Sequence, residues 1–291
     1  MSVTNAMTVD VEDYFQVSAF ESVIDRNDWE KLECRIPRNV DKILELFSRH
    51  EVKSTFFTLG WVAERMPQVV RAIVDAGHEV ASHGWSHVRV PNATPESFFE
   101  DIDRTRKLLQ DVSGQPVNGY RAASYSVTLQ TLWVYENFQK AGYRYSSSIF
   151  PIKHDLYGIP GAPRQPFVVE EAGIVEIPLT TLRFMGRNLP FSGGGWFRLM
   201  PYGLFRAGLR RVNKTEQASG IFYFHPWEVD PQQPRQQNLP AKTAFRHYLN
   251  LEKMESRVEQ LLQDFSWNTM ESTFMKSDDY QLISLAELAR S

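Results

Sequence analysis

Apolar segments with the residue types of β-strands alternate along this chain with segments whose apolar residues recur at helical spacing. In one helical segment, Val40, Ile43, Leu44 and Phe47 fall at positions i, i+3, i+4 and i+7, which places them on one face. We predict strands at residues 7–11, 52–59, 79–82, 117–122, 168–170, 174–179, 220–224 and 280–284. Further helices are predicted at about residues 67–77, 95–114, 129–140 and 243–265. This order predicts an α/β fold with a parallel sheet and right-handed crossovers.

The predicted sheet suits a barrel better than an open nucleotide-binding sheet. No Gly-rich phosphate loop follows the first strand, and the run Gly193-Gly194-Gly195 lies between aromatic residues instead. The sequence contains no internal repeat and no convincing linker. We therefore expect one domain over residues 1–291, with a motif-bearing core at about 7–235 and a C-terminal helix and strand at about 243–285.

The charge balance and the cysteine content exclude several classes of function. With 32 Lys and Arg against 35 Asp and Glu, the chain has a net charge of -3 and no basic stripe for nucleic acid. The single cysteine, Cys34, cannot form an internal disulfide. Residues 1–10 lack the pattern of a secretory signal, and no segment approaches the roughly 20 apolar residues of a membrane span. We expect a cytoplasmic protein without a nucleic-acid partner.

Polar residues that can carry chemistry fall where predicted strands end. They are Asp10, Glu12 and Asp13 at the first strand, His83 and His87 after the third, Arg121 in the next, and His225 after residues 220–224. In parallel α/β barrels the carboxyl ends of the strands lie on one face of the molecule, where functional groups gather. The sequence therefore predicts that these side chains form a single site.

The two histidines and a carboxylate are a candidate metal site. His83 and His87 stand four positions apart, so both imidazoles can lie on one face of a helical turn. Two neutral imidazoles and one carboxylate make three ligands for a divalent ion and leave room for water and substrate. For the third ligand we favour Asp13, with Glu12 as the alternative, and we expect Asp10 to act as a base.

Five segments in this order resemble the NodB-homology polysaccharide deacetylases, also called carbohydrate esterase family four. They are residues 8–15 (TVDVEDYF), 82–87 (SHGWSH), 119–126 (GYRAASYS), 145–151 (YSSSIFP) and 222–228 (FYFHPWE). The resemblance extends to the exosortase-associated exopolysaccharide branch, which is grouped with allantoinase-like and peptidoglycan-deacetylase-like members. It implies a distorted, incomplete (β/α) barrel of about seven units.

The resemblance also implies roles for individual residues. It assigns Zn²⁺ or a similar divalent ion to Asp13, His83 and His87, the base to Asp10, the acid to His225 and the orientation of Asp10 to Arg121. These roles fit the chemistry of amide hydrolysis, in which a metal acidifies water, a base removes a proton and an acid protonates the leaving amine. For the oxyanion we expect a further donor, a backbone N–H near Tyr125.

Aromatic residues near the same loops are candidates for stacking on a sugar ring. We assign this role to Tyr125, Trp196 and Trp227, and we expect the loop at residues 193–197 to line the substrate groove. The chain departs from the family pattern at Ala123, where proline is usual, and at Ser146, where the branch commonly has aspartate. Neither position is a metal ligand, so we expect activity to survive.

We therefore expect the hydrolytic removal of an acetyl group from an N-acetylated sugar. The substrate would be a polysaccharide, as in exopolysaccharide biosynthesis, or a lipid- or nucleotide-linked precursor of one. Two alternatives stay open. The first is hydrolysis of a different C–N bond, as in the allantoinase-like relatives, and the second is carbohydrate binding without catalysis.

Overall fold

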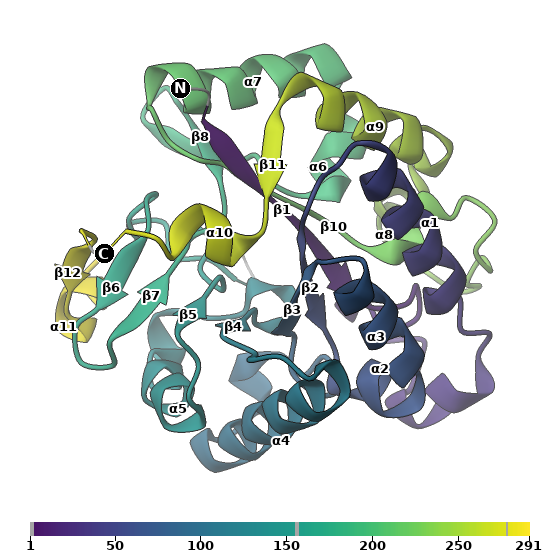
Figure 1. Ribbon diagram of the computed structural model, residues 1–291, viewed down its shortest axis with the longest axis horizontal. Coiled ribbons are helices and arrows are strands. Elements are labelled where there is room, and N and C mark those ends of the chain that lie inside the picture. The colour runs from purple at the N-terminus through teal and green to yellow at the C-terminus, as the bar shows by residue number, and fades with distance from the viewer. Residues whose placement is uncertain (1–2, 155–156, 278) are drawn as a thin grey trace.

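A largely parallel sheet of ten strands runs through the molecule, with helices packed around it (Figure 1). The computed structural model describes residues 3–154, 157–277 and 279–291. The strands are β1 (Thr4–Val11), β2 (Thr55–Thr58), β3 (Glu79–Ser82), β4 (Gly119–Tyr120), β5 (Tyr145–Ser146), β6 (Phe167–Val169), β7 (Ile174–Glu176), β8 (Thr181–Phe184), β9 (Arg187–Pro190), β10 (Ile221–Phe224), β11 (Ser266–Asn268) and β12 (Gln281–Ile283). The α-helices are α1 (Ile36–Arg49), α2 (Gly60–Arg65), α3 (Pro67–Asp75), α4 (Pro95–Ser113), α5 (Val134–Ala141), α6 (Gly194–Leu199), α7 (Tyr202–Thr215), α8 (Ala241–Tyr248), α9 (Met254–Asp264), α10 (Met270–Phe274) and α11 (Leu285–Leu288).

The strand order places the first strand near the middle of the sheet. The strands follow the order β10-β1-β2-β3-β4-β5-β7-β6-β12, with β11 paired to the start of β1. The β6–β7 pair is antiparallel, the other pairs of this sheet are parallel, and β8 and β9 form a separate hairpin. The predicted α/β fold with a parallel sheet is confirmed. Within the described residues no backbone pairing joins β12 to β10, so hydrogen bonds do not close the sheet into a complete barrel.

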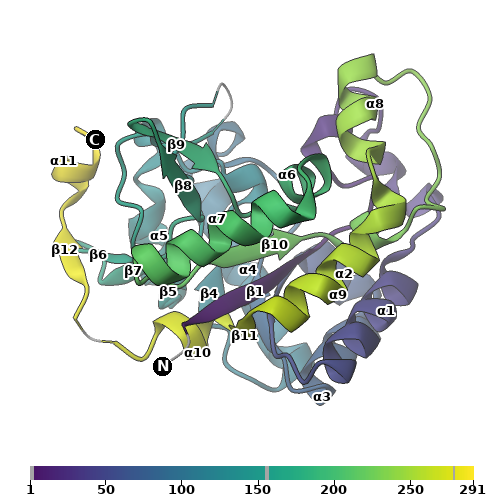
Figure 2. The same ribbon diagram turned by 90° about the horizontal axis from the view of Figure 1, so that it is seen from above.

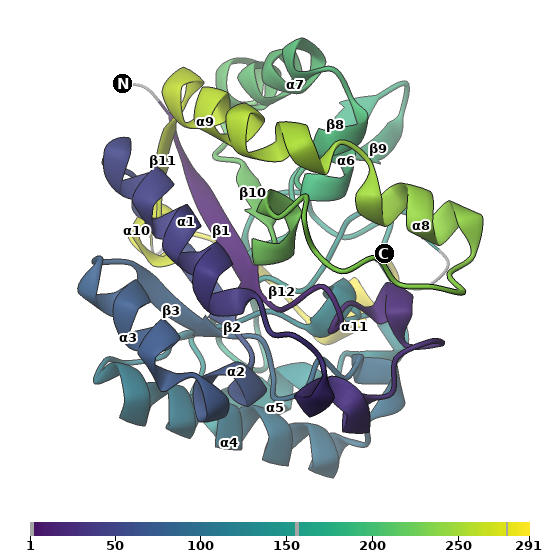
Figure 3. The same ribbon diagram turned by 90° about the vertical axis from the view of Figure 1, so that its right-hand side faces the viewer.

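Burial on both faces explains the composition of the central strands. From its second residue to its last, β1 is buried, and all four residues of β2 are buried. Both strands contain β-branched and aromatic residues, Val9 and Val11 in β1 and Phe56 and Phe57 in β2, which is why they could be predicted from the sequence. Helices α1 to α5 pack on the outside of this part of the sheet (Figures 1 and 3). No helix among the described residues is long and apolar enough to cross a bilayer.

The C-terminal region departs from the prediction of one long helix at 243–265. The structure has two helices there, α8 and α9, separated at Asn250, which adopts a left-handed conformation with φ of 51°. Asparagine tolerates this conformation better than most residues, and its side-chain amide donates to the carbonyl of Arg198 at 2.8 Å. The break turns α8 away from α9, so that α8 projects at one end of the molecule (Figure 2). The β8–β9 hairpin and α7 were not predicted as elements.

A buried histidine links the start of β3 to the preceding strand. His78 is 4% exposed, its ring packs against Phe47 and Phe56, and its Nδ1 accepts a hydrogen bond from the Ser54 N–H at 3.1 Å. Burial, together with the charge of Lys53, lowers the pKa of His78 to about 4. The folded protein therefore holds this imidazole neutral over a range of pH in which the unfolded chain would protonate it.

We predict that His78 makes the fold sensitive to acid. The unfolded chain takes up the proton near pH 6.5 and the folded protein only near pH 4, so stability is complete above 6.5 and falls as the pH drops towards 4. The loss due to this residue is at most about 3 kcal/mol. His78→Gln keeps a hydrogen-bond acceptor and does not titrate. Urea unfolding at pH 7, 5.5 and 4 should show the stability advantage of the wild type over H78Q shrinking with acid; a constant difference would contradict the prediction.

Candidate active site

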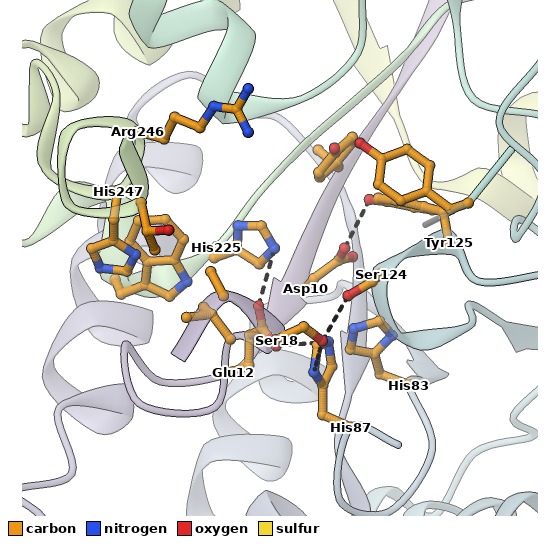
Figure 4. A pocket seen from close by; sticks show the side chains of 16 residues that line it. Asp10, Glu12, Ser18, His83, His87, Ser124, Tyr125, His225, Arg246 and His247 are labelled. Carbon is orange, nitrogen blue, oxygen red and sulfur yellow. Dashed lines mark hydrogen bonds and ion pairs between the residues drawn. The ribbon is translucent and has the colours of Figure 1, made fainter. Parts of the chain in front are cut away.

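A cavity of about 310 Å³ lies at the carboxyl ends of β1, β3 and β10 (Figure 4). Five of the acidic and histidine residues singled out in the sequence line it: Asp10, Glu12, His83, His87 and His225. These residues come from segments as far apart in sequence as β1 and β10, which are neighbours because the two strands pair in parallel from Ala6 to Val9. The expected convergence of polar groups at the strand ends is therefore what the structure shows.

Asp10 is held on both of its carboxylate oxygens. Arg121 Nη1 donates to Oδ1 at 2.6 Å, and the Tyr125 hydroxyl donates to Oδ2 at 3.0 Å. Burial by itself raises the pKa of Asp10, but the positive charge of Arg121, with smaller contributions from His83 and His225, outweighs burial and holds the pKa below its usual range. Asp10 is therefore an ionised carboxylate with spare lone pairs that face the cavity.

Arg121 lies behind the cavity rather than in its lining. Its side chain is completely buried, and Nη1 also donates to the Thr8 hydroxyl at 2.8 Å while Nη2 donates to the Ser147 hydroxyl at 3.3 Å. The guanidinium lies 3.9 Å from the centre of the Phe57 ring. These contacts fix Arg121 from three segments, namely β1, β2 and the segment after β5, so it can orient Asp10 without touching a ligand in the cavity.

Glu12, His83 and His87 form a compact cluster. One ligand atom of each lies within 4.8 Å of the others, and Glu12 Oε2 is 3.1 Å from His87 Nε2. His83 Nδ1 donates to the carbonyl of Arg121 at 2.8 Å, and His87 Nδ1 is 3.5 Å from the Ser18 hydroxyl. Because these contacts occupy the Nδ1 atoms, the Nε2 atoms are the ones left to face Glu12 and to bind a metal.

The chemistry of this cluster fits a cation. Burial raises the pKa of Glu12 to about 8, and its Oε2 has no hydrogen-bond donor within the described residues. Burial also lowers the pKa of His83, and lowers that of His87 well below its usual value, so both imidazoles are neutral ligands. A buried carboxyl group with one oxygen that lacks a donor, next to two neutral imidazoles, is a suitable site for a positive ion.

Asp13, the preferred third ligand in the sequence analysis, lies elsewhere. Its Oδ1 accepts from the Tyr14 N–H at 2.8 Å, and its Oδ2 accepts from the N–H groups of Arg35 and Ile36 at 2.6 and 3.2 Å. Both oxygens therefore satisfy backbone donors, two of them at the start of α1, where a carboxylate also meets the positive end of the helix. The assignment of Asp13 to the metal is wrong on this geometry, and Glu12, the alternative, takes its place beside the histidines.

His225 lies between two carboxylates. Its Nδ1 is 2.8 Å from Glu228 Oε1, and its Nε2 is 3.2 Å from Glu12 Oε1. Burial alone lowers the pKa of His225, but the charge of Glu12 and the hydrogen bond to Glu228 raise it to about 9. Glu228 is in turn ionised beside the buried Arg198, whose Nε donates to it at 2.8 Å. His225 is therefore oriented through Nδ1 and carries a proton at Nε2.

Of the three aromatic residues proposed for sugar stacking, two reach the cavity. Tyr125 and Trp227 line it, and Trp227 stacks between the rings of His225 and His247 with interplanar angles of 16° and 12°. Trp196 lies on α6, is 43% exposed and is not part of the lining. The Tyr125 N–H, in the region proposed to stabilise the oxyanion, donates instead to the carbonyl of Ala122 at 2.9 Å.

The glycine-rich loop before α6 packs behind the site instead of lining a groove. A Cβ at Gly193 would collide with the Tyr223 hydroxyl, and one at Gly194 would collide with the Glu228 carboxylate. The glycines therefore allow the backbone to approach two side chains that support the site. Functional roles for Glu228, Arg198, Arg246 and His247 were not predicted from the sequence. The buried ion pair of Arg198 and Glu228 joins α6 to the segment after β10, and a pair between distant segments produces no recognisable local sequence motif.

Backbone strain also gathers at this site. His87, Ser124 and Tyr125 are non-glycine residues with φ of 53–55°, in the left-handed region. Such conformations cost about 1–3 kcal/mol each and persist where surrounding contacts fix them, commonly at functional sites. Here the contacts are the hydrogen bonds of His87 to Ser18, of Ser124 to Ser18 at 2.9 Å, and of Tyr125 to Asp10.

Two protein families match adjacent parts of the chain, and the two matches meet near its middle. Residues 27–146 match the family described as polysaccharide deacetylase, and this range contains His83, His87 and Arg121. Residues 147–275 match a domain of unknown function, and this range contains His225, Arg198 and α8. Residues 27–146 are therefore similar to polysaccharide deacetylases, while the placement in the exosortase-associated branch stays a prediction.

Individual proteins show the same similarity, one through a short sequence alignment and others through a shared fold. A peptidoglycan-N-acetylglucosamine deacetylase of Bacillus cereus is 34% identical over 73 residues, which cover 25% of this chain and 26% of that protein. Thus the chain aligns with about a quarter of that curated relative. A solved structure from Mycobacterium smegmatis, described as a polysaccharide deacetylase, has a TM-score of 0.57 at 14% identity and covers 99% of this chain and 90% of that one. A family 4 carbohydrate esterase pseudoenzyme from Bacillus anthracis has a TM-score of 0.50 at 12% identity, covering 97% and 67%. At these identities the structures show a shared fold, and the pseudoenzyme shows that the fold alone does not imply turnover.

We predict that Glu12 and Asp13 have separable roles. Glu12→Gln removes one of the three candidate ligands and should weaken the affinity for a divalent metal such as zinc roughly tenfold or more, with little change in folding. Asp13→Asn removes a charge and one acceptor at the start of α1 and should lower the unfolding free energy by about 1–2 kcal/mol while zinc binding is kept. Metal content by mass spectrometry and thermal unfolding of both variants test this. Loss of zinc in D13N but not in E12Q would reverse the assignment.

Proposed function

We propose that this relative of the polysaccharide deacetylases hydrolyses the N-acetyl group of a sugar unit in a polysaccharide or its precursor, with a divalent metal. The observation that carries the proposal is the arrangement of three elements around one cavity. These are a His-His-Glu cluster, an ionised Asp10 held by Arg121, and a proton-bearing His225 held by Glu228. A protein that only binds sugars needs neither a base nor an acid, so this arrangement favours catalysis over binding alone.

The residues of the cluster would hold the metal and leave the cavity side open to ligands. Glu12, His83 and His87 supply three ligands, a number typical of catalytic rather than structural zinc sites. When bound, a divalent ion, for which we propose Zn²⁺, polarises an acyl carbonyl and lowers the pKa of water. An amide is a weak electrophile, so this cluster is the part of the site on which the acyl carbonyl must be placed.

Asp10 would act as the base. Its two oxygens already accept hydrogen bonds from Arg121 and Tyr125, which fix the carboxylate plane, and each oxygen can accept one more. The positive charge of Arg121 keeps Asp10 ionised in a buried site, where an isolated carboxylate would be protonated. Asp10 can therefore take a proton from water in the cavity as that water attacks the acyl carbon.

His225 would act as the acid. Because its Nδ1–H is donated to Glu228, the proton available for transfer is the one on Nε2, on the side of Glu12 and the cavity. The leaving group in N-deacetylation is a sugar amine, which departs only when it is protonated. A protonated imidazole at this position supplies that proton, and Glu228 fixes its direction.

The lining of the cavity supports a sugar as the substrate. Trp227, Tyr125 and Tyr223 present aromatic rings beside the charged groups, as in pockets that bind sugar rings through their apolar faces. Both faces of the Trp227 ring are covered, by His225 and by His247, so this ring is held firmly beside the cavity and the faces of Tyr125 and Tyr223 are the better candidates for contact with a sugar. Hydrolysis of another C–N bond would use the same acid and base, and it is distinguished from sugar deacetylation by the substrate turned over.

We predict that Asp10→Asn abolishes turnover while the site still binds metal. The amide cannot accept the proton of water, so kcat for acetate release should fall about 100-fold or more. The measurement is acetate release from chitooligosaccharides and from an N-acetylated exopolysaccharide by zinc-loaded protein. Asp103→Asn on α4, remote from the cavity, is the matched control and should behave as wild type. Wild-type protein that binds zinc and releases acetate from neither substrate would overturn the proposal.

A further inference from the structure

Among the residues that the structure describes, one strong cation lines the cavity, and no acidic side chain pairs with it. Arg246, in the last turn of α8, is the only lysine or arginine among the residues that line the cavity. Its guanidinium forms neither an ion pair nor a hydrogen bond within residues 3–154, 157–277 and 279–291, although most arginines near the site do. Arg121 and Arg198, by contrast, are buried and paired with Asp10 and Glu228.

The backbone that carries Arg246 is firmly held. The buried guanidinium of Arg198 donates to the carbonyls of Arg246, His247 and Leu249 at 3.3, 2.9 and 2.6 Å. His247 adds its stack on Trp227, with ring centres 4.1 Å apart, and a contact of 2.7 Å between its Nε2 and Gln233 Oε1. The end of α8 is thus tied to the same Arg198–Glu228 pair that orients His225.

The side chain of Arg246 extends from this fixed backbone over the cavity, on the side away from Glu12, His83 and His87 (Figure 4). Tyr157 also lines the cavity, and the charge of Arg246 partly offsets the rise that burial gives to the pKa of Tyr157. Both side chains therefore border the same cavity. Arg246 can donate hydrogen bonds from its guanidinium group, and Tyr157 from its hydroxyl group, to a ligand in the cavity.

The charges of the cavity are separated. Asp10 and the cluster of Glu12, His83 and His87 lie at its floor, and Arg246 lies at its outer edge. The floor suits a neutral acyl group, while the outer edge attracts a negative group. A guanidinium binds carboxylate or phosphate through two parallel hydrogen bonds, a geometry that a neutral hydroxyl cannot match.

Given the proposed deacetylation, we infer that the substrate carries an anionic group, a carboxylate or a phosphate, beside its N-acetylated sugar, and that Arg246 binds this group. The feature belongs to residues 147–275, outside the range that matches the polysaccharide deacetylase family. Arg246 is thus a specificity residue added to the shared hydrolytic site, and it selects acidic glycans or phosphate-linked sugars over neutral ones.

The test compares probes that differ in charge. The carboxylate arm uses a disaccharide of N-acetylglucosamine and glucuronic acid, with the N-acetylglucosamine–glucose disaccharide as its neutral counterpart, and the phosphate arm uses UDP-N-acetylglucosamine. Affinity by titration calorimetry and kcat/KM for acetate release are measured for wild type, Arg246→Gln and Lys242→Gln. Lys242 is the matched control, because it is an exposed cation of the same helix that does not line the cavity.

R246Q should weaken binding of an anionic probe about five- to tenfold more than binding of the neutral probe, and K242Q should not. High salt should reduce the preference of the wild type for the anionic probe. The arm with the larger effect of R246Q identifies the anion. Equal effects of R246Q on charged and neutral probes, or the same selective loss in K242Q, would overturn the inference. Arg246-dependent binding without any acetate release would instead overturn the proposed function and leave the anion site standing.

Discussion

The ion pair between Asp10 and Arg121 is the interaction on which the site depends. Both side chains are at most 2% exposed, and removing one partner of such a pair typically costs about 3–5 kcal/mol because the other charge is left unpaired. Arg121 also binds Thr8 and Ser147, so the same guanidinium joins the end of β4 to β1 and to the segment after β5. His83 is held in turn by the carbonyl of Arg121. The positions of the carboxylate and of one imidazole therefore follow from a single buried cation.

A second row of charges extends from the cluster to the edge of the cavity. Glu12, His225, Glu228 and Arg198 follow one another in this row, and neighbouring members lie 2.8–3.2 Å apart. His225, Glu228 and Arg198 alternate in sign. Each buried charge in this row has an opposite charge beside it, which offsets the cost of taking it out of water. Because Arg198 also binds three carbonyls at the end of α8, the row that orients His225 places Arg246 as well. Arg198 therefore connects His225, at the floor of the cavity, to the backbone of Arg246 at its outer edge.

Much of the fold could be predicted because its central elements have strong local patterns. β1, β2 and β3 are short segments that contain strand-forming residues such as Val, Phe and Thr, and α4 has both a capping box at Thr94 and a left-handed glycine, Gly114, at its end. The weaker elements were not predicted: the β8–β9 hairpin has exposed apolar residues without strict alternation, and α8 ends where Asn250 adopts a left-handed conformation. Such breaks depend on tertiary contacts, here the bond from Asn250 to Arg198.

The sequence by itself determined the chemical inventory of the site: two histidines four positions apart, carboxylates at the end of the first strand, an arginine in a later strand and a histidine after β10. Parallel strands place such residues on one face whatever the details of the loops. Only the tertiary structure decided between Glu12 and Asp13, because the choice depends on where the start of α1 lies. Two backbone N–H groups there, 22 and 23 positions along the chain from Asp13, donate hydrogen bonds to its carboxylate. The same holds for Trp196, Glu228 and Arg246: whether a side chain faces the cavity is set by contacts between distant segments, and local patterns do not record these contacts.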